Sequence, residues 1–570
     1  MATYFKRTSV HKIIQSLIRL GQLGFKDGRK LEDSLVSLIR VREASKMFKA
    51  SERQLELRAD SLSTLVGEGW KESVVNDKVN LSDTENVYLD KDFIRVQLDN
   101  REFSQHILKN IQQAGPSYGY ERLESSPETV LVEYSSPNIA KPFHAGHLRS
   151  TIIGNVIANL YEALGHNVIR LNFLGDWGTQ FGLLAAGFKK YGQFKKLEER
   201  DPMLHLFEVY VRINQDVSAE DESDMRKKAT YAEGLELFRK LEQGDPEIVS
   251  LWKTFRKITM EENNKMYERL GIKFTETHTE SMYNDKVKDI VKRLEKEGLL
   301  KYNESGVGYM DVMFAGRLGP AKLVKSDGTS LYLSRDVSAA VDRYERFKFD
   351  RMHYVVEMGQ RSHFEQLIGV LRLMKEPWIL ERELGDVHIQ FGRIEGMSTR
   401  KGEVIFLRDI VDEAKSRMIK TLKEKQTTRD GIEVEEVSDR LGISSIIVQD
   451  LKDRRIRNYK FSWDRMLNFK SDSGVFLQYC HARLCSMQRT CGVDLQDGAA
   501  VDSLVEEEAQ QLVLHMARYP DVVQKAWVNL EPCYIVQYLF RLAHLTNVAY
   551  SHLPVKGQHS DVAQVGQSDL

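Results

Sequence analysis

The chain has 570 residues, enough for two to four domains, and its 82 basic and 83 acidic side chains leave a formal net charge of −1. This balance excludes the global positive field that marks many nucleic-acid-binding proteins, although local bias remains. The four cysteines form no C-x-x-C pair, which favours free thiols in a reducing compartment over a disulfide framework, and no apolar run approaches the about 20 residues that a membrane-spanning helix needs.

The first 26 residues are basic and lack acidic residues, the first acid being Asp27. Their apolar residues fit one face of a helix: Val10, Ile13, Ile14, Leu17, Ile18 and Leu20. This pattern predicts a mitochondrial transit peptide over residues 1–26, and composition alone equally allows the first helix of an N-terminal domain. Residues 27–118 mix helical and extended patterns and end in a turn-rich stretch, which predicts a small additional α+β domain.

A strand–helix–strand unit is predicted next. Residues 129–134 begin with four apolar or β-branched residues in a row and predict a strand. Residues 145–164 carry apolar side chains at helical spacing and are followed by a glycine. Residues 168–173 predict a second strand. His144 and His147 stand three residues apart at the start of the helix, so their side chains point the same way.

The turn before this helix, H-A-G-H at residues 144–147, suits a phosphate group. A helix N-terminus offers free N–H groups and about half a positive charge, and two imidazoles add donors. Gly146 lets a flat base approach the backbone closely, so the turn predicts a nucleotide site at the carboxyl end of a parallel strand. Three alternatives remain open here: a metal site, for which no nearby ligand completes a set, a capping or core role for either histidine, and a chance match.

The rest of the chain shows a regular change of pattern. Residues 119–410 alternate strands and helices, which predicts a parallel sheet with helices on both faces, and a charged insertion, mostly helical to about residue 300, occupies about residues 184–330 of it. Residues 411–554 contain little Pro or Gly and carry apolar residues at helical spacing, which predicts an all-helical bundle. Residues 555–570 are polar and contain Gly and Ser, so we expect them to be disordered.

Several blocks of sequence resemble one family. Residues 133–150, E-Y-S-S-P-N-I-A-K-P-F-H-A-G-H-L-R-S, closely resemble the signature of class I aminoacyl-tRNA synthetases in the form carried by arginyl-tRNA synthetases. Further blocks follow in the family's order: G-D-W-G-T-Q-F-G at 175–182, S-D-G-T-S-L-Y and R-D within 326–336, G-Q and H-F within 359–364, and F-G with M-S-T-R-K-G within 391–402. Within the family, the sequences of these blocks are most similar to those of the mitochondrial enzymes of animals. The resemblance implies an α/β fold, a class I synthetase Rossmann-like sheet with helical insertions, followed by an anticodon-binding helical bundle.

The resemblance also implies a reaction. ATP, with Mg²⁺ carried by the nucleotide, would activate arginine to arginyl-adenylate, and the arginyl group would then move to the 3′ end of arginine tRNA. The implied catalytic residues are Lys141, His144 and His147, and the implied ATP contacts are His144, Gly146, His147, His363, Met397 and Ser398. The second class I signature loop is commonly Lys-Met-Ser-Lys, whereas residues 396–399 read G-M-S-T. Lys141 is the family's compensation for the two absent lysines, with a surface loop lysine as the alternative, and Arg400 and Lys401 suit either a contribution to ATP binding or a soluble loop tip.

Recognition of arginine requires carboxylates and planar acceptors that match a guanidinium group. The implied arginine ligands are Glu133, Ser136, Asn138, Tyr332, Asp336 and Gln360. Tyr332 and Asp336 are four residues apart and so share one side of a helix, with core packing and a helix N-terminal position as their alternatives. Burial of Glu133 at a strand end would be costly without a cation. Such a site rejects lysine strongly, so no editing domain is expected.

A basic and aromatic segment, residues 450–463, suits phosphate contact and base stacking, and it suits an exposed amphipathic helix nearly as well. The candidate tRNA-binding residues are Arg454, Arg455, Arg457, Lys460 and Tyr479. We expect a monomer without a resident metal or membrane attachment, in the mitochondrial matrix or alternatively the cytoplasm. The polar C-terminal residues depart from the family's apolar closing helix and predict weakened tRNA docking. Two other functions stay open: another nucleotidyl-transferring enzyme, and a catalytically silent tRNA-binding protein.

Overall fold

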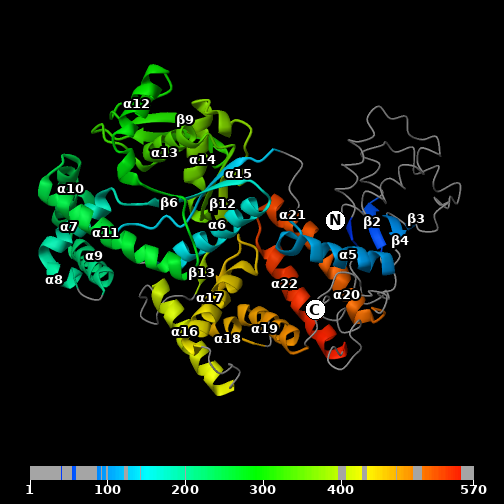
Figure 1. Ribbon diagram of the computed structural model, residues 1–570. Helices are drawn as coiled ribbons and strands as arrows, with labels where there is room; N and C mark the ends of the chain where they lie inside the picture. The colour runs from blue at the N-terminus through cyan, green and yellow to red at the C-terminus, as the bar shows by residue number, and fades with distance from the viewer. Residues whose placement is uncertain are drawn as a thin grey trace, which may run out of the picture. The chain divides into compact units, whose positions relative to one another are not determined.

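The structure, a computed structural model, describes residues 40–41, 54–58, 87–90, 93–97, 100–120, 126–141, 143–198, 201–395, 406–425, 433–469, 472–491 and 504–553 (Figure 1). The predicted transit peptide, the predicted polar tail and the two candidates Met397 and Ser398 lie outside these residues. The chain divides into two compact units. Unit 1 comprises Met1–Arg122 and Asn468–Leu570, and unit 2 comprises Leu123–Leu467.

Unit 2 is built on a five-stranded sheet whose pairings are all parallel, in the order β12–β11–β5–β6–β7. The strands are β5 Thr129–Glu133, β6 Asn167–Leu174, β7 Glu276–Thr279, β11 Arg351–Glu357 and β12 His388–Phe391. The chain runs outward from β5 to β6 and β7 and then returns to the other side of β5. The order therefore reverses between β5 and β11, and ligands of such sheets bind at the carboxyl ends of the strands beside this point.

Helices cover both faces of the sheet, as the sequence predicts for an α/β fold. Helix α6 (Ala145–Ala163) packs on β5, β6 and β11. On the other face, Leu131 of β5 belongs to a core shared with α13 (Tyr332–Phe347) and α14 (Arg361–Leu373). A fully buried parallel strand has apolar side chains on both faces, which explains the continuous run T-V-L-V in β5.

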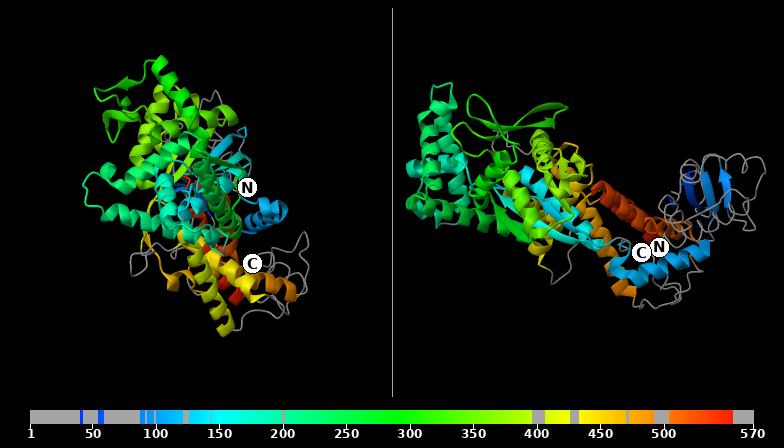
Figure 2. Two further views of the ribbon diagram at one scale, coloured as in Figure 1. Left: turned by 90° about the vertical axis from the view of Figure 1, so that its left-hand side faces the viewer. Right: turned by 90° about the horizontal axis from the view of Figure 1, so that it is seen from above.

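The insertions in the sheet are helical at first, as predicted (Figure 2). They contain α7 Thr179–Tyr191, α8 Phe194–Leu197, α9 Pro202–Ala219, α10 Ala229–Glu242, α11 Pro246–Arg269 and α12 Lys286–Lys296. Asp201 and Asp245 cap α9 and α11, each followed by proline at the first helical position. An antiparallel sheet follows α12: β8 Lys301–Tyr302, β9 Gly308–Phe314 and β10 Arg317–Val324.

The later part of unit 2 contains two long helices, α16 Leu407–Lys425 and α17 Val434–Leu451. Its short elements include η4 Met358–Gln360, α15 Leu384–Val387, β13 Ile394–Glu395, β14 Tyr459–Lys460 and α18 Trp463–Met466. Helices α16 to α18 therefore share the unit of the parallel sheet. The predicted boundary at residue 411 differs from this division, because α17 packs against α6 rather than only against later helices.

Unit 1 combines the two ends of the chain. Its N-terminal part has an antiparallel sheet, β1 Arg40–Val41, β2 Gln54–Arg58, β4 Phe93–Gln97 and β3 Val87–Asp90 in that order, and helix α5 Asn100–Ala114. Its C-terminal part has α19 Gly474–Cys491, α20 Glu507–Met516, α21 Tyr519–Asn529 and α22 Cys533–His552. Tyr118 donates a hydrogen bond of 3.0 Å to the Met516 carbonyl, which ties the two parts together. Of the helices described, none has both the length and the apolar character to span a membrane.

Candidate active site

The H-A-G-H turn forms the N-terminus of α6 at the carboxyl end of β5. His144 is the N-cap residue, and its Nδ1 accepts a hydrogen bond of 3.1 Å from the Gly146 N–H. The His147 Nδ1 lies 3.4 Å from the His144 N–H and accepts from it. Because each Nδ1 is an acceptor, each neutral ring carries its proton on Nε2. The two rings stack with centroids 3.8 Å apart and planes 21° apart, so the turn carries two neighbouring Nε2–H donors.

Burial keeps these imidazoles neutral. Desolvation lowers the pKa of His144 and places that of His147 well below its ordinary value, and the nearby Lys141 charge lowers both further. Neutral donors can approach phosphate oxygens without first losing a tightly held water shell. Lys141 is half-buried, with its Nζ 5.5 Å from the centre of the Tyr210 ring, and desolvation lowers its pKa.

The loop between β5 and α6 adopts an unusual backbone that α6 stabilises. Ser135, Ser136 and Ala140 have φ values of 76°, 48° and 54°, in the left-handed region that side chains other than glycine rarely adopt. The Ser150 hydroxyl accepts from the Ser135 N–H at 2.9 Å, and the Thr151 hydroxyl lies 2.8 Å from the Ser135 Oγ. The strained loop and the histidine turn are therefore held by one helix, which is typical of a functional loop.

Glu133, the last residue of β5, is buried and forms an ion pair with the equally buried Arg343 of α13. Desolvation raises the pKa of Glu133, and the Arg343 charge opposes that rise. The cation that burial of this carboxylate requires thus comes from the chain itself. The other carboxylate oxygen, Oε1, lies 3.5 Å from the Ser136 hydroxyl, so two predicted arginine ligands adjoin each other.

Tyr332 and Asp336 both lie in the first two turns of α13, on the same side of the helix as the spacing predicts. The Asp336 Oδ2 is 2.7 Å from the Nε2 of His363 in α14. Burial disfavours a charged His363, but the Asp336 carboxylate outweighs this and raises the pKa of the imidazole. His363, a predicted ATP contact, therefore adjoins the carboxylate predicted for arginine.

Glu280 is a further acidic residue that the sequence analysis did not find. It begins the short helix η3 (Glu280–Tyr283) directly after β7 and is buried. Desolvation raises the pKa of Glu280 to about 7, against a hydrogen bond with the Tyr332 hydroxyl and the charge of Arg335, whose Nη1 lies 3.5 Å from the carboxylate. Its position at the carboxyl end of a strand is the signal that would have found it. Tyr332 thus stands between two acids, Glu280 and Asp336.

The other predicted arginine ligands occupy the same end of the sheet. Asn138 forms an isolated parallel bridge with Gly175, which follows β6. A Cβ atom on Gly175 would collide with the Asn138 Oδ1, so a larger residue there would displace the Asn138 side chain. Gln360 ends the short helix η4 after β11 and is exposed. The ends of β5, β7 and β11 therefore each carry a candidate residue, and the residue after β6, Gly175, pairs with Asn138.

The candidate tRNA-binding residues are placed less uniformly. Arg454, Arg457 and Lys460 are exposed, as a role in phosphate contact requires. The Arg455 guanidinium instead donates to the Gln390 carbonyl at 2.7 Å. In unit 1, Tyr479 of α19 is exposed, and the guanidinium carbon of Arg483 lies 5.9 Å from its ring centre.

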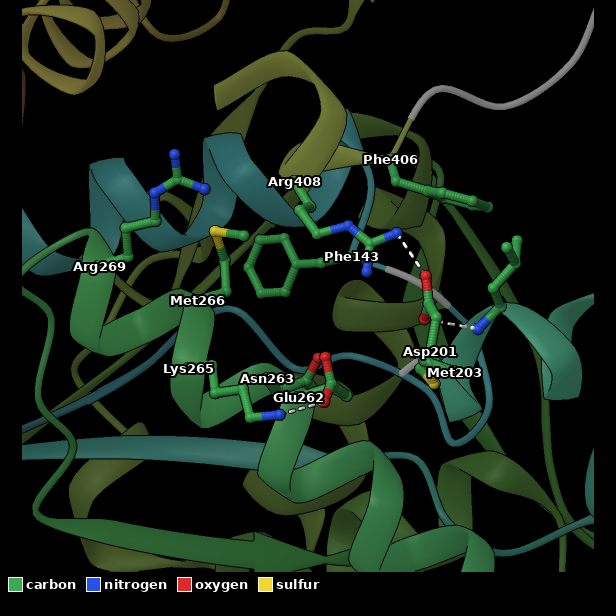
Figure 3. Close-up of a pocket in the computed structure, with 11 residues that line it drawn as sticks. Phe143, Asp201, Met203, Glu262, Asn263, Lys265, Met266, Arg269, Phe406 and Arg408 are labelled. Carbon is green, nitrogen blue, oxygen red and sulfur yellow. Dashed lines mark hydrogen bonds and ion pairs between the residues drawn. The ribbon is translucent and has the colours of Figure 1, made fainter. Parts of the chain in front are cut away.

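A cavity of about 170 Å³ lies beside Phe143, the residue before the histidine turn (Figure 3). Its charged groups are paired: Arg408 with Asp201 at 2.7 Å, and Lys265 with Glu262 at 2.5 Å. The cavity is lined by Phe143, Asp201, Met203, Leu204, Glu262, Asn263, Lys265, Met266, Arg269, Phe406 and Arg408. Of the predicted ATP and arginine ligands that the structure describes, none is among these lining residues.

Comparison with known proteins identifies the family. The family of class I tRNA synthetases (R), catalytic domain, matches residues 104–463, and the DALR anticodon binding domain matches residues 477–567. The chain is 42% identical over 469 residues to the probable mitochondrial arginine–tRNA ligase of Mus musculus, covering 81% of this chain and 79% of that protein. It is also 42% identical over 476 residues to the cytoplasmic arginine–tRNA ligase of Saccharomyces cerevisiae, covering 83% and 77%.

Solved structures support the same fold. The arginyl-tRNA synthetase of Thermus thermophilus superposes with a TM-score of 0.76 at 19% identity, over 99% of this chain and 97% of that one. The arginyl-tRNA synthetase of Plasmodium falciparum gives a TM-score of 0.75 at 23% identity, over 99% and 95%. With a catalytic family match over more than half its length and relatives above 40% identity, the chain belongs to the arginyl-tRNA synthetases of class I.

Proposed function

We propose that this protein is an arginine–tRNA ligase of mitochondrial translation. The observation that carries the proposal is that hydrogen-bond donors suited to phosphate and acidic side chains suited to a guanidinium group both lie at the carboxyl ends of the strands, where the strand order reverses. Two neutral Nε2–H donors stand at the N-terminus of α6, and two acids accompany Tyr332: Glu280 of η3 and Asp336, one turn later in α13. The first suits phosphate and the second suits a guanidinium group. The matching family and the names of the relatives support arginine and its tRNA as substrates.

The reaction needs alignment rather than a covalent enzyme intermediate. In the first step, a carboxylate oxygen of arginine attacks the α-phosphorus of ATP, and pyrophosphate leaves with its Mg²⁺. In the second, a ribose hydroxyl of the tRNA 3′ end attacks the acyl carbon, and AMP leaves. His144, His147 and Lys141 would stabilise charge on the phosphates in the first step, and the backbone of Gly146 would adjoin the nucleotide. Met397 and Ser398 remain predicted ATP contacts.

Asp336 and Glu280 would bind the guanidinium group, with Tyr332 packed against it. Ser136, Asn138 and Gln360 would hold the α-amino and carboxylate groups. Glu133 stays a predicted ligand, and its pairing with Arg343 implies that it contacts arginine with the oxygen beside Ser136. Two acids for one guanidinium explain why lysine, which lacks the planar fork, would be rejected.

Exchange of pyrophosphate into ATP tests the proposal. We expect exchange that depends on arginine, measured with and without arginine tRNA, and the family resemblance implies that the tRNA is required. Lysine should not replace arginine. Absence of arginine-dependent exchange under both conditions would refute the proposal in favour of a catalytically silent tRNA-binding protein.

The tRNA contact is proposed for two places. Arg454, Arg457 and Lys460 would contact phosphates, and Tyr479 would stack on a base of the anticodon loop, because it is exposed and lies beside Arg483. Arg455 is less suited, since its guanidinium is bound to a backbone carbonyl. Filter binding across a salt series should show each of the three cations lowering the salt slope by about one when replaced by alanine.

The mitochondrial location rests on the basic start of the sequence and on the names of several relatives, among which cytoplasmic enzymes also occur. Residues 1–30 fused to a fluorescent reporter should be imported into mitochondria. A diffuse cytosolic signal would favour the cytoplasmic alternative.

A further inference from the structure

A buried ion pair outside the predicted substrate ligands joins α6 to α17. The Arg149 Nε lies 2.9 Å from the Asp450 Oδ1, and the two side chains are 1% and 0% exposed. The Tyr459 hydroxyl donates to the same carboxylate oxygen at 3.0 Å. Arg149 comes two residues after the H-A-G-H turn, so this pair is attached directly to the proposed ATP site.

The same guanidinium binds three backbone carbonyls. Its Nη1 donates to Gly392 at 2.6 Å and to Arg457 at 3.0 Å, and its Nη2 donates to Arg455 at 3.2 Å. These carbonyls belong to two separate segments, one directly after β12 and one that we call the strap, residues 454–461. A guanidinium fork can reach this many acceptors at once, whereas an ammonium group on a single stem cannot.

The strap pairs with the chain that enters the second signature loop. The Gly392 N–H donates to the Arg455 carbonyl at 2.8 Å, and the Tyr459 N–H donates to the Arg393 carbonyl at 3.1 Å. β13 and β14 then pair in parallel. A Cβ on Gly392 would lie 2.6 Å from the Arg457 carbonyl carbon, so only glycine allows this approach. The pairing ends at Glu395, one residue before the G-M-S-T stretch.

The chain that leaves the second signature loop is held by the first signature as well. The Leu407 N–H donates to the Phe143 carbonyl at 2.8 Å, and Phe406 forms an antiparallel bridge with His144. Residues 143–149 therefore hold both ends of the loop, one through backbone pairing and the other through Arg149.

We propose that Arg149 is a positioning residue for adenylate formation. It fixes residues 392–395, the backbone that leaves β12, relative to His144 and His147 at the start of its own helix α6. Asp450 and Tyr459 hold the guanidinium in the orientation that reaches the three carbonyls. The inference rests on the proposed function of this site, and it assigns Asp450, Tyr459 and the backbone of the strap to the positioning of Arg149, which leaves the exposed cations of the segment for tRNA contact.

Arg149→Lys tests this role, because it keeps the charge opposite Asp450 and removes the fork. We expect kcat for pyrophosphate exchange to fall on the order of 100-fold, as a shift of His144 and His147 relative to residues 392–395 by about 1 Å would cause, while the KM for arginine changes less than twofold. Arginine binding measured directly by calorimetry should be unchanged. Arg351→Lys is the matched control, since Arg351 forms a two-bond pair with Glu128, at 2.5 and 3.0 Å, at the amino ends of the strands, and its exchange rate should stay at the wild-type value.

Tyr459→Phe is a second, milder variant, which removes only the hydroxyl that holds Asp450. It should lower kcat by about three- to tenfold, the effect of one lost hydrogen bond, without changing the KM for arginine. An unchanged kcat in a folded Arg149→Lys protein would overturn the proposal, as would a rise in the KM for arginine equal to the fall in kcat. If Arg149→Lys does not fold, an unchanged kcat in Tyr459→Phe overturns it. Absence of exchange in the wild-type protein would refute the proposed function itself, which separates the two failures.

Discussion

At the scale of single residues, the site concentrates ionisable groups whose burial shifts their protonation. His144 and His147 are kept neutral by desolvation, whereas His363 gains basicity from Asp336. Glu280 titrates near neutral pH. Burial thus favours the neutral forms of His144, His147 and Glu280 alike, whereas the Asp336 carboxylate favours the charged form of His363.

Asp336→Asn should weaken arginine binding selectively. The change preserves the shape of the side chain and removes the charge opposite the guanidinium, a loss of about 1.5–3 kcal/mol, or roughly 10- to 150-fold. We expect the KM for arginine in pyrophosphate exchange to rise by this factor and the KM for ATP to change less than threefold. The control is Asp311→Asn on β9, which breaks an exposed ion pair with Lys301 of β8. Equal rises in both KM values would contradict the assignment.

The titration of Glu280 should appear in the pH dependence of arginine binding. Its pKa in the folded protein is about 7, so the carboxylate becomes fully charged only above neutrality. The KM for arginine should therefore fall as the pH rises from about 6 to 8, and Glu280→Gln should remove much of this dependence. Stability should change in the opposite sense. Because the unfolded carboxyl ionises near its ordinary pKa of 4.5, the free energy of unfolding falls between about pH 4.5 and 7 in the wild type and falls less in the variant.

At the scale of secondary-structure elements, the local unit around the signature could be read from the sequence. The apolar run of β5, the helical spacing of α6 and the histidine pair predict a strand, a helix and a phosphate turn. The structure has the strand and the helix, with both histidines at the start of the helix, and the binding of phosphate there stays a prediction. The contacts of Glu280 and Arg149 could not be predicted in the same way. Each lies more than 50 residues from its partners Tyr332 and Asp450, and hydrophobic periodicity does not specify such long-range pairings.

The composition of the segment 450–463 and its structure differ in what they indicate. Its alternation of cations and aromatic residues predicted a nucleic-acid surface. In the structure, Tyr459 instead binds the buried Asp450, and the backbone of the strap accepts from Arg149. Amino-acid composition describes side chains only. The strap is held mainly through backbone carbonyl groups, which every residue has, so its contacts with Arg149 could not be predicted from composition.

The packing of α6 onto β5 depends on Gly154. A Cβ at this position would lie inside van der Waals contact with the Cβ and Cγ of Tyr134. Alanine normally stabilises a helix by about 0.5–1 kcal/mol relative to glycine, but here the collision should reverse the sign and destabilise unit 2 by about 1–3 kcal/mol. Thermal unfolding would measure the difference. Gly385→Ala in α15, where a Cβ meets open space, is the matched control.

At the scale of the whole molecule, the chain divides where the sequence does not mark a break. The helical pattern continues across Leu467, yet α16 to α18 belong with the parallel sheet and α19 to α22 belong with the N-terminal residues. The matched catalytic family ends at residue 463, close to this division. Periodicity identifies helices, but it does not say which core each helix joins.

Two compact units predict two unfolding steps. Ligands that bind one unit stabilise that unit alone, so arginine with a non-hydrolysable ATP analogue should raise only the transition of unit 2. At about 100 times its Kd, a ligand contributes roughly 2.7 kcal/mol to that step. Differential scanning calorimetry would resolve the two transitions. A single transition that shifts as a whole would show that the units unfold together.

The ion pair between Glu133 and Arg343 has one further consequence. The chain encloses a guanidinium group of its own beside the place proposed for the substrate's guanidinium. Truncation of Arg343 to alanine would leave a space of the size of a guanidinium ion beside the unpaired Glu133 carboxylate. Millimolar guanidinium chloride, far below denaturing concentrations, should then restore activity lost in the variant, and urea, which is similar in shape but uncharged, should not. Such chemical rescue would show that Glu133 requires a cation beside it, whether or not that cation is attached to the chain.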